Sequence, residues 1–291
     1  MMEKQDLTRP EIGSIPVGYE GRVFVVEHGG SFAESVALLC ERAGLSGRID
    51  GKPVLIKPNL IEAMRPPITT PAVLVEGIVS YLKEAVDGVR IIIGEGTGAS
   101  EYATDHCFAT LGYDQLASKY NIPLLDLNEA ELVEKRRPDC RRWPVMHLPA
   151  IVYDSFLLSV PVLKAHSLAG VTLTMKNMMG AAPPSHYQRG GHWKKSSFHE
   201  DMQAAVLDLN RYRAADFTLL DATVGMQVAH LWGPVCDPPP NKLAAGYDPV
   251  AIDAFGAGLL GRNWRDIGHI RGAHGELGVA DPLRLEYCQH G

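Results

Sequence analysis

The stretch KPVLIKPNL (residues 52–60) decides the fold class of this chain. Its apolar residues predict a short buried strand, which a lysine, a proline and an asparagine end abruptly. A helix is predicted for residues 71–85, with Thr70 as its N-cap and a proline at its first position. A second buried strand, VRIIIGEGTG (residues 89–98), follows and runs into a glycine-rich loop. This order of strand, helix and strand predicts a βαβ unit with parallel strands.

The same alternation continues on both sides of this unit. Further strands are predicted at residues 22–30, 122–127, 154–166 and 216–225, and further helices at residues 31–44, 100–113, 199–215 and 248–261. We therefore predict an α/β fold with a mainly parallel sheet and flanking helices.

The two halves of the chain carry the same motifs in the same order. A strand that ends in Lys-x-Asn at residues 57–59 corresponds to one that ends in Lys-x-His at residues 164–166. Glu-Gly-Thr at residues 95–97 likewise corresponds to Asp-Ala-Thr at residues 221–223. Because parallel α/β sheets bind ligands at the carboxyl ends of their strands, we expect all four motifs to face one central cleft.

This repeat suggests how the chain is organised. An N-terminal arm is expected over residues 1–20, followed by a single α/β domain over residues 21–285. Within the domain we predict two similar lobes, residues 21–150 and 151–285. An insertion at residues 172–198 has no counterpart in the first lobe, which makes it the favoured place for an added function.

Composition excludes several classes of function. The 291 residues are 46% hydrophobic and 21% charged, with a net charge of -6 and a pI near 6.0, so no nucleic-acid partner is expected. The one basic cluster, at residues 134–143, is predicted to be a solvated loop or hairpin. No apolar run reaches the ~18 residues of a membrane span, so we expect no membrane partner and a cytoplasmic location.

The cysteines do not form a metal-binding pattern. The sequence has five of them, far apart and without a CxxC pair: Cys40, Cys107, Cys140, Cys236 and Cys288. Neither a zinc ribbon nor an iron–sulfur cluster is therefore expected from this chain.

Four basic residues are the catalytic candidates: Lys57, Lys164, His166 and Lys176. A lysine at a strand end can bind phosphate or carboxylate, and partial burial lowers its pKa enough for proton transfer. Histidine carries protons near neutral pH. The alternative is that these lysines are surface side chains whose amines reach solvent.

The ligand-binding candidates are small polar residues close to these bases: Asn59, Thr70, Gly96, Thr97, Asn177 and Thr223. The glycine-rich GEGTG loop could offer backbone amides to a phosphate, although tight-turn chemistry explains its composition equally well. A divalent metal is also considered, with Glu95, Asp221 and His199 as mixed oxygen and nitrogen ligands. The alternative role for the two acids is as partner carboxylates of the bases.

Six stretches of the chain together resemble a known family, catalogued as domain of unknown function 362. They are VLIKPNL, TTPAVLVEGIV, IIIGEGTG, VPVLKAHSLAGVTLTMKNMMG, LLDATVGM and AAGYDPVAIDAFGAGLLG, and the resemblance runs over residues 22–281. Many members of that family resemble iron–sulfur proteins through an added ferredoxin-type module. This chain has no CxxCxxC run, so it resembles a member without that module.

These observations predict an enzyme that binds an anionic small molecule in a cleft lined by lysine, histidine and aspartate. The chemistry would be general acid–base or metal-assisted. Two alternatives stay open, namely a redox or iron–sulfur-associated protein, as the resemblance implies, and a non-catalytic ligand-binding module. The substrate, the cofactor and a homo-oligomeric state are left open by the sequence.

Overall fold

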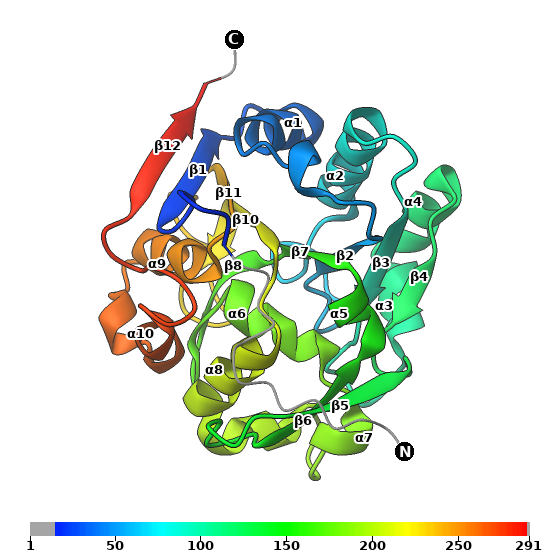
Figure 1. The fold of residues 1–291 in the computed structure, drawn as a ribbon, viewed down its shortest axis with the longest axis vertical. Coiled ribbons are helices and arrows are strands. Elements are labelled where there is room, and N and C mark those ends of the chain that lie inside the picture. The colour runs from blue at the N-terminus through cyan, green and yellow to red at the C-terminus, as the bar shows by residue number, and fades with distance from the viewer. Residues whose placement is uncertain (1–14, 290–291) are drawn as a thin grey trace.

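The computed structural model describes residues 15–289, and ten of its strands form one sheet. These strands are β1 (Arg22–Glu27), β2 (Val54–Pro58), β3 (Ile91–Glu95), β4 (Leu124–Asp126), β7 (Phe156–Val160), β8 (Val162–His166), β9 (Gly170–Thr172), β10 (Phe217–Met226), β11 (Lys242–Gly246) and β12 (Arg284–Cys288). Eight of them run in the order β12-β1-β11-β10-β7-β2-β3-β4, while β8 pairs with β10 and β9 (Figure 1).

The sheet is mainly parallel, as the sequence predicts. Six of its nine strand pairings are parallel, among them β7–β2, β2–β3 and β3–β4. The antiparallel pairings are β1–β11, β10–β11 and β8–β9. The parallel strands β2, β3, β7 and β10 therefore have their carboxyl ends at one edge of the sheet.

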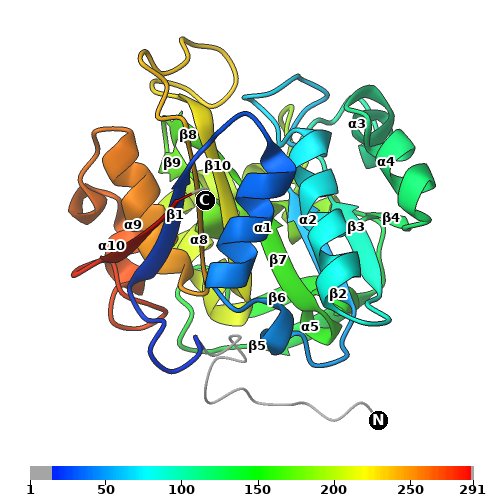
Figure 2. The ribbon, with the colours of Figure 1, turned by 90° about the horizontal axis from the view of Figure 1, so that it is seen from above.

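Helices cover both faces of the sheet. On one face lie α1 (Phe32–Arg42), α2 (Ala72–Ala85), α3 (Thr104–Thr110) and α4 (Tyr113–Tyr120), and on the other α5 (Ala150–Asp154), α6 (Thr174–Asn177), α8 (Met202–Tyr212), α9 (Pro249–Leu259) and α10 (Gly268–Ala273) (Figures 1 and 2). The short helix α7 (Pro184–Tyr187) lies beyond α6 in the insertion. The predicted α/β architecture with flanking helices is confirmed.

The sheet separates two hydrophobic cores. In β2, Val54 and Ile56 belong to the core beneath α1 and α2, whereas Leu55 belongs to the core beneath α6, α8 and α9. All three side chains are fully buried. Successive residues of a strand point to opposite faces, so a central parallel strand needs a continuous apolar run.

The two predicted lobes share this one sheet. Strand β2 of the first lobe pairs directly with β7 of the second, β3 and β4 continue the sheet from β2, and β1 lies between β11 and β12. The predicted arm over residues 1–20 lies outside the described residues as far as residue 14. Tyr19 is described, and its ring packs edge-on against Tyr247 with the ring centroids 4.8 Å apart.

Two local predictions can be compared directly with the structure. The basic cluster at residues 134–143 forms part of a hairpin, because β5 (Leu132–Arg136) and β6 (Val145–Pro149) pair antiparallel. The predicted cap of α2 is wrong, since Pro71 is the N-cap and Thr70 makes no cap hydrogen bond. No helix among residues 15–289 is both long and apolar enough to cross a bilayer.

Candidate functional site

A buried ion pair joins the carboxyl ends of two neighbouring strands. Lys57 lies near the end of β2 and Glu95 at the end of β3, and Lys57 Nζ is 2.8 Å and 2.9 Å from the two carboxylate oxygens. Glu95 also accepts hydrogen bonds from the backbone N–H groups of Leu60 and Gly96, at 3.2 Å and 2.8 Å. Burial lowers the pKa of Lys57, and the attraction of Glu95 opposes this shift.

Two asparagines connect this pair to the second half of the chain. Asn59 Nδ2 donates to Asn177 Oδ1 at 2.9 Å, and Asn177 Nδ2 donates to Ser159 Oγ at 3.0 Å. Lys164 Nζ in turn donates to Asn59 Oδ1 at 2.8 Å. The structure thus brings together five of the predicted site residues, Lys57, Asn59, Glu95, Lys164 and Asn177. We call these five the inner network.

Lys164 is fully buried but differs from Lys57 in its partners. Its Nζ donates to Asn59 Oδ1 and to the backbone carbonyl of Ile68, at 2.8 Å and 2.5 Å. No carboxylate among residues 15–289 lies within ion-pair distance of it. Burial, followed by repulsion from Lys176, holds the pKa of Lys164 well below its ordinary value.

Thr70 is not part of the inner network but fixes it in place. Its hydroxyl donates to the carbonyl of Val160 in β7 at 2.6 Å and accepts from the backbone N–H of Asn59 at 2.9 Å. It therefore fixes the chain that leaves β2 against the end of β7. This contact explains why its hydroxyl does not cap α2.

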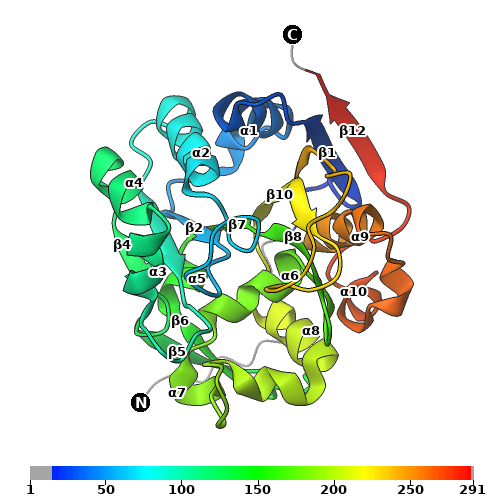
Figure 3. The same ribbon diagram turned by 180° about the vertical axis from the view of Figure 1, so that it is seen from behind.

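A cavity of about 410 Å³ opens next to the inner network, and we call it the outer chamber. Residues of β8, α6, the insertion and the loop after β10 line it, together with residues from the loops after β2, β3 and β8 and from the turn before α8. They are Ile61, Gly98, His166, Ser167, Leu168, Lys176, Met179, Trp193, Lys195, His199, Ala229, His230, Leu231 and Trp232. That loop runs beside β8 and α6 at the strand ends (Figures 2 and 3). The outer chamber is thus built mainly by the second half of the chain.

A second cavity of about 50 Å³, the inner recess, adjoins the outer chamber. Asn59, Glu95, Gly96, Thr172, Asn177 and Gly180 line it together with five residues shared with the outer chamber, which are Ile61, Gly98, Lys176, Met179 and Lys195. Lys176 and Lys195 therefore stand where the two cavities meet.

These two lysines are buried and carry no carboxylate partner. Lys176 is 6% exposed, and its amine makes no hydrogen bond or ion pair with any described residue. Lys195 is 5% exposed and donates to Asn128 Oδ1 and to the carbonyl of Ala182. Burial lowers the pKa of Lys176 to about 8 and that of Lys195 to about 7.

The position of α6 explains where Lys176 and Asn177 point. Asp253 in α9 accepts hydrogen bonds from the backbone N–H groups of Thr174 and Met175, at 2.7 Å and 3.0 Å. This carboxylate satisfies the first turn of α6, which would otherwise leave buried donors unpaired. Burial raises the pKa of Asp253 to about 7.

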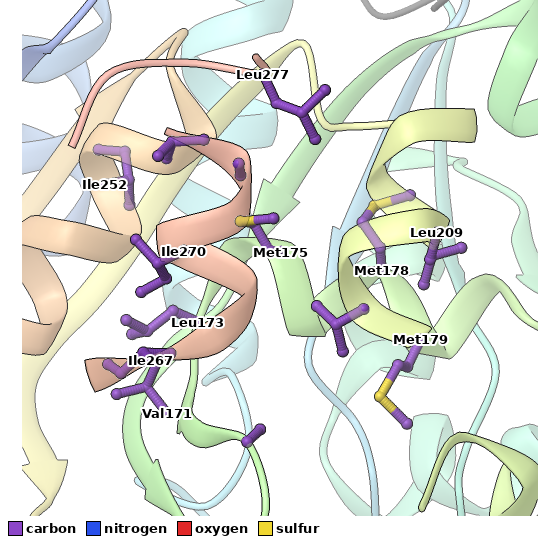
Figure 4. Packing of buried hydrophobic residues seen from close by; sticks show 14 of the residues in the cluster. Val171, Leu173, Met175, Met178, Met179, Leu209, Ile252, Ile267, Ile270 and Leu277 are labelled. Atoms are coloured by element: carbon purple, nitrogen blue, oxygen red, sulfur yellow. The ribbon is translucent and has the colours of Figure 1, made fainter. Parts of the chain in front are cut away.

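The methionines beside Lys176 pack into the core. Met175 and Met178 are fully buried among side chains of β9, α8, α9 and α10 (Figure 4). Met179 also belongs to this core but reaches the lining of both cavities. The segment therefore directs its lysine and amide to the site while its apolar side chains fix it to the core.

His166 is held as a neutral ring that accepts through Nδ1 and carries its proton on Nε2. Its Nδ1 accepts from the backbone N–H groups of Leu168 and Ala169, at 3.1 Å and 3.2 Å. The hydrogen bonds assign the remaining ring proton to Nε2. Burial and the charge of Lys176 lower the pKa of His166, and the His230 ring stacks on it with centroids 4.1 Å apart.

The three predicted metal ligands are not brought together. Glu95 is engaged by Lys57, while His199 lines the outer chamber. Asp221 lines neither cavity and accepts from the N–H and hydroxyl of Thr223, at 3.0 Å and 2.7 Å. Throughout the described part of the chain, no group of three or more His, Cys, Asp or Glu side chains could hold a metal ion. Burial raises the pKa of Asp221.

The glycine-rich loop does not present free amides to a ligand. The N–H groups of Gly96, Thr97 and Gly98 donate to Glu95 Oε1, Thr104 Oγ1 and the carbonyl of Ile61. The Thr97 hydroxyl donates to the same carbonyl at 2.9 Å. Gly96 lines the inner recess, and close packing against Gly180 explains its lack of a side chain, because a Cβ would overlap the Gly180 carbonyl.

Lys195 and His230 were not among the predicted site residues. Lys195 follows Trp193 in the insertion, which the sequence did indicate as the place for an added function. His230 lies in the loop after β10, where no periodic pattern shows the direction of a side chain.

A family model described as Domain of unknown function (DUF362) matches residues 54–258 and so confirms the resemblance found in the motifs. A search of curated proteins gave no match. Among solved structures, a similar one is the lactate racemase apoprotein from Thermoanaerobacterium thermosaccharolyticum, with 16% sequence identity and a TM-score of 0.46. The similarity covers 84% of this chain and 57% of that protein, so the chain spans a little over half its length.

Proposed function

We propose that this chain, which belongs to the family described as Domain of unknown function (DUF362), is an enzyme that binds an anionic small molecule. One observation carries this proposal. Lys176 and Lys195 are buried in the lining of both cavities, and Lys164 is buried and bonded to Asn59 of the inner recess. None of the three has an ion pair with a carboxylate in the described residues. Buried charges are costly unless they are paired, so an anionic ligand would supply the missing countercharge.

The size and lining of the cavities support a small-molecule ligand. The outer chamber, at about 410 Å³, lies within the range of roughly 300–1,000 Å³ that is typical of ligand sites. Seven of its fourteen lining residues are apolar, and of its basic residues the two lysines stand where it meets the inner recess. This arrangement favours a ligand with an anionic end near Lys176 and Lys195.

The proposed chemistry is proton transfer by a lysine. Catalytic bases work best when their pKa lies near the working pH, and the pKa of Lys176 is about 8. His166 would act as a hydrogen-bond donor through Nε2, because its Nδ1 is occupied by two backbone amides. The inner network would hold Lys176 and Asn177 in place rather than react.

The test is a thermal-shift screen with carboxylated and phosphorylated metabolites, followed by an assay for turnover of each hit. We expect a hit to raise the melting temperature of the wild type, and Lys176→Met and Lys195→Met to weaken its binding by at least about tenfold. Lys83→Met, which removes an exposed lysine of α2, is the matched control and should bind normally.

Two results would contradict the proposal. Equal stabilisation of all four proteins by every hit would place the anion site elsewhere. Binding that depends on Lys176 without any turnover would instead identify a non-catalytic ligand-binding module.

A further inference from the structure

Lys176 differs from the three other buried lysines of the site. Lys57 is paired with Glu95, Lys164 donates to an amide and a carbonyl, and Lys195 also donates to an amide and a carbonyl. Lys176 has no such partner, although it lines both the outer chamber and the inner recess. Its amine therefore faces the cavities, where a bound ligand could contact it directly.

We propose that Lys176 is a carbonyl-reactive amine that forms an imine with a 2-oxo acid bound in the outer chamber. This inference rests on the anion site of the proposed function, names the class of its substrate, and makes Lys176 the nucleophile instead of the proton carrier. A 2-oxo acid combines an anionic carboxylate with an adjacent carbonyl, which matches two lysines that line the same junction of cavities and have different partners.

Only a neutral amine attacks a carbonyl carbon, and the surroundings of Lys176 favour that form. Its charge lowers the pKa of Lys164, His166, His199, His230 and His269, and Lys195 and Glu95 share the inner recess with it. Glu95 is already paired with Lys57, and all the other groups are bases. Burial lowers the pKa of Lys176 to about 8, and lysines activated in this way are known to form Schiff bases.

The reaction balances without a further reactant. The neutral Nζ adds to the carbonyl carbon to give a carbinolamine, and a carbon–nitrogen bond forms. The carbonyl oxygen then leaves as water and takes both hydrogens of the amine, while a carbon–nitrogen double bond forms. No oxidant or reductant is consumed, and hydrolysis reverses the step.

The surroundings also indicate what the rest of the acid looks like. Lys195 lines the same junction of the two cavities as Lys176 and would pair with the carboxylate. Apart from these lysines, a serine and three histidines, the wall of the outer chamber is mainly apolar, with Leu168, Trp193 and Leu231 among its residues. A 2-oxo acid with a branched or aromatic apolar body would therefore bind better than one with a polar body.

The experiment uses 4-methyl-2-oxopentanoate as the probe and sodium cyanoborohydride to reduce any imine to a stable amine. The full chain is incubated near pH 8, and the adduct is measured by whole-protein mass spectrometry and located by peptide mapping. We expect one adduct per chain, located on Lys176 in the wild type. Lys176→Arg should abolish it, and Lys83→Arg should leave it unchanged.

Two analogues separate the roles of the two lysines. The ketone 4-methylpentan-2-one lacks the carboxylate, so its labelling should be slow in the wild type and unaffected by Lys195→Met. Labelling by the oxo acid should fall by at least about tenfold in Lys195→Met. Mapping of the wild type does not depend on the folding of any variant.

The outcomes distinguish this inference from the proposed function. Adducts spread evenly over many lysines, or located on a lysine other than Lys176, would overturn the imine. A third result would also overturn the imine: no adduct forms, yet 4-methylpentanoate, which lacks the carbonyl, stabilises the protein. That result would leave the proposed anion site supported. If neither acid stabilises the protein and the oxo acid does not label it, the proposed imine is contradicted. The proposal of an anion site is then contradicted for apolar acids as well.

Discussion

Two buried lysines of one site, Lys57 and Lys176, have opposite surroundings. Lys57 faces a carboxylate that accepts two short hydrogen bonds from it, whereas Lys176 faces a cavity. Both side chains are almost completely withdrawn from solvent. Burial of a charged residue therefore does not by itself indicate function. What separates a structural lysine from a candidate functional one is the presence or absence of a protein partner.

The largest expected effect tests the structural side of this comparison. Glu95→Gln removes the carboxylate and leaves Lys57 buried without its countercharge, which should lower the free energy of unfolding by about 3–5 kcal/mol. Urea denaturation would measure this change. Glu27→Gln, which breaks an exposed pair with Lys242, should unfold close to the wild type. If the two variants lost equal stability, the inner network would not be the structural part of the site.

A smaller effect is expected from Gly180→Ala. The new methyl group would overlap Glu95 and come within 2.5 Å of Lys57 Nζ, and such overpacking costs about 1–3 kcal/mol of unfolding free energy. Gly258→Ala is the matched control, because Gly258 lies in α9 with open space around its Cβ position. That variant should be slightly more stable, by roughly 0.5–1 kcal/mol. Equal melting temperatures for the two variants would contradict the packing described around Glu95.

Lys176→Met is expected to change stability in the opposite direction. Removal of an unpaired buried amine should raise the free energy of unfolding of the ligand-free protein, by roughly 1–2 kcal/mol at neutral pH. The same variant should lose ligand binding, as described above. A clear loss of stability would mean that Lys176 has a structural partner, and the contrast with Lys57 would disappear.

The smallest effect is a change of stability with pH. The pKa values of Lys176 and Lys195, about 8 and about 7, lie below their ordinary value of 10.5, so at intermediate pH the unfolded chain binds more protons. The stability of the ligand-free protein should therefore rise from about pH 7 to about pH 10.5, and the burial of both charged amines destabilises the fold most below this range. Denaturation at several pH values would show this, and the Lys176→Met, Lys195→Met double variant should have a flatter profile. A profile that the double variant leaves unchanged would indicate that neither lysine is perturbed.

Some features of the site follow from the sequence alone. An apolar run that stops at Lys57 and another that stops at Glu95 predict two neighbouring parallel strands with polar ends at one edge. The two-residue period of a strand and the parallel pairing of strands in βαβ units are enough to predict that these two ends lie close together. The same reasoning correctly brings Lys164 and Asn59 together, although their contact bridges two halves of the chain.

Other features could not be read from the sequence. Asp221 corresponds to Glu95 in the predicted internal repeat, yet it accepts hydrogen bonds from Thr223 and lines neither cavity. A motif does not reveal the face to which a side chain points. Strand β11 is short and rich in alanine, so it lacks the β-branched residues that mark a strand. Lys195 enters the site from a segment without a regular period, and only its tertiary contacts place it there.

The long reach of the inner network has a consequence for how the protein acquires its activity. Lys57 contacts Glu95 across 38 positions of sequence and Asn177 across 120. Contacts between such distant segments form late, because the entropy of closing long loops must first be overcome. During synthesis the site would remain incomplete until the segment around Asn177 has left the ribosome. Neither half of the chain, expressed alone, should acquire it.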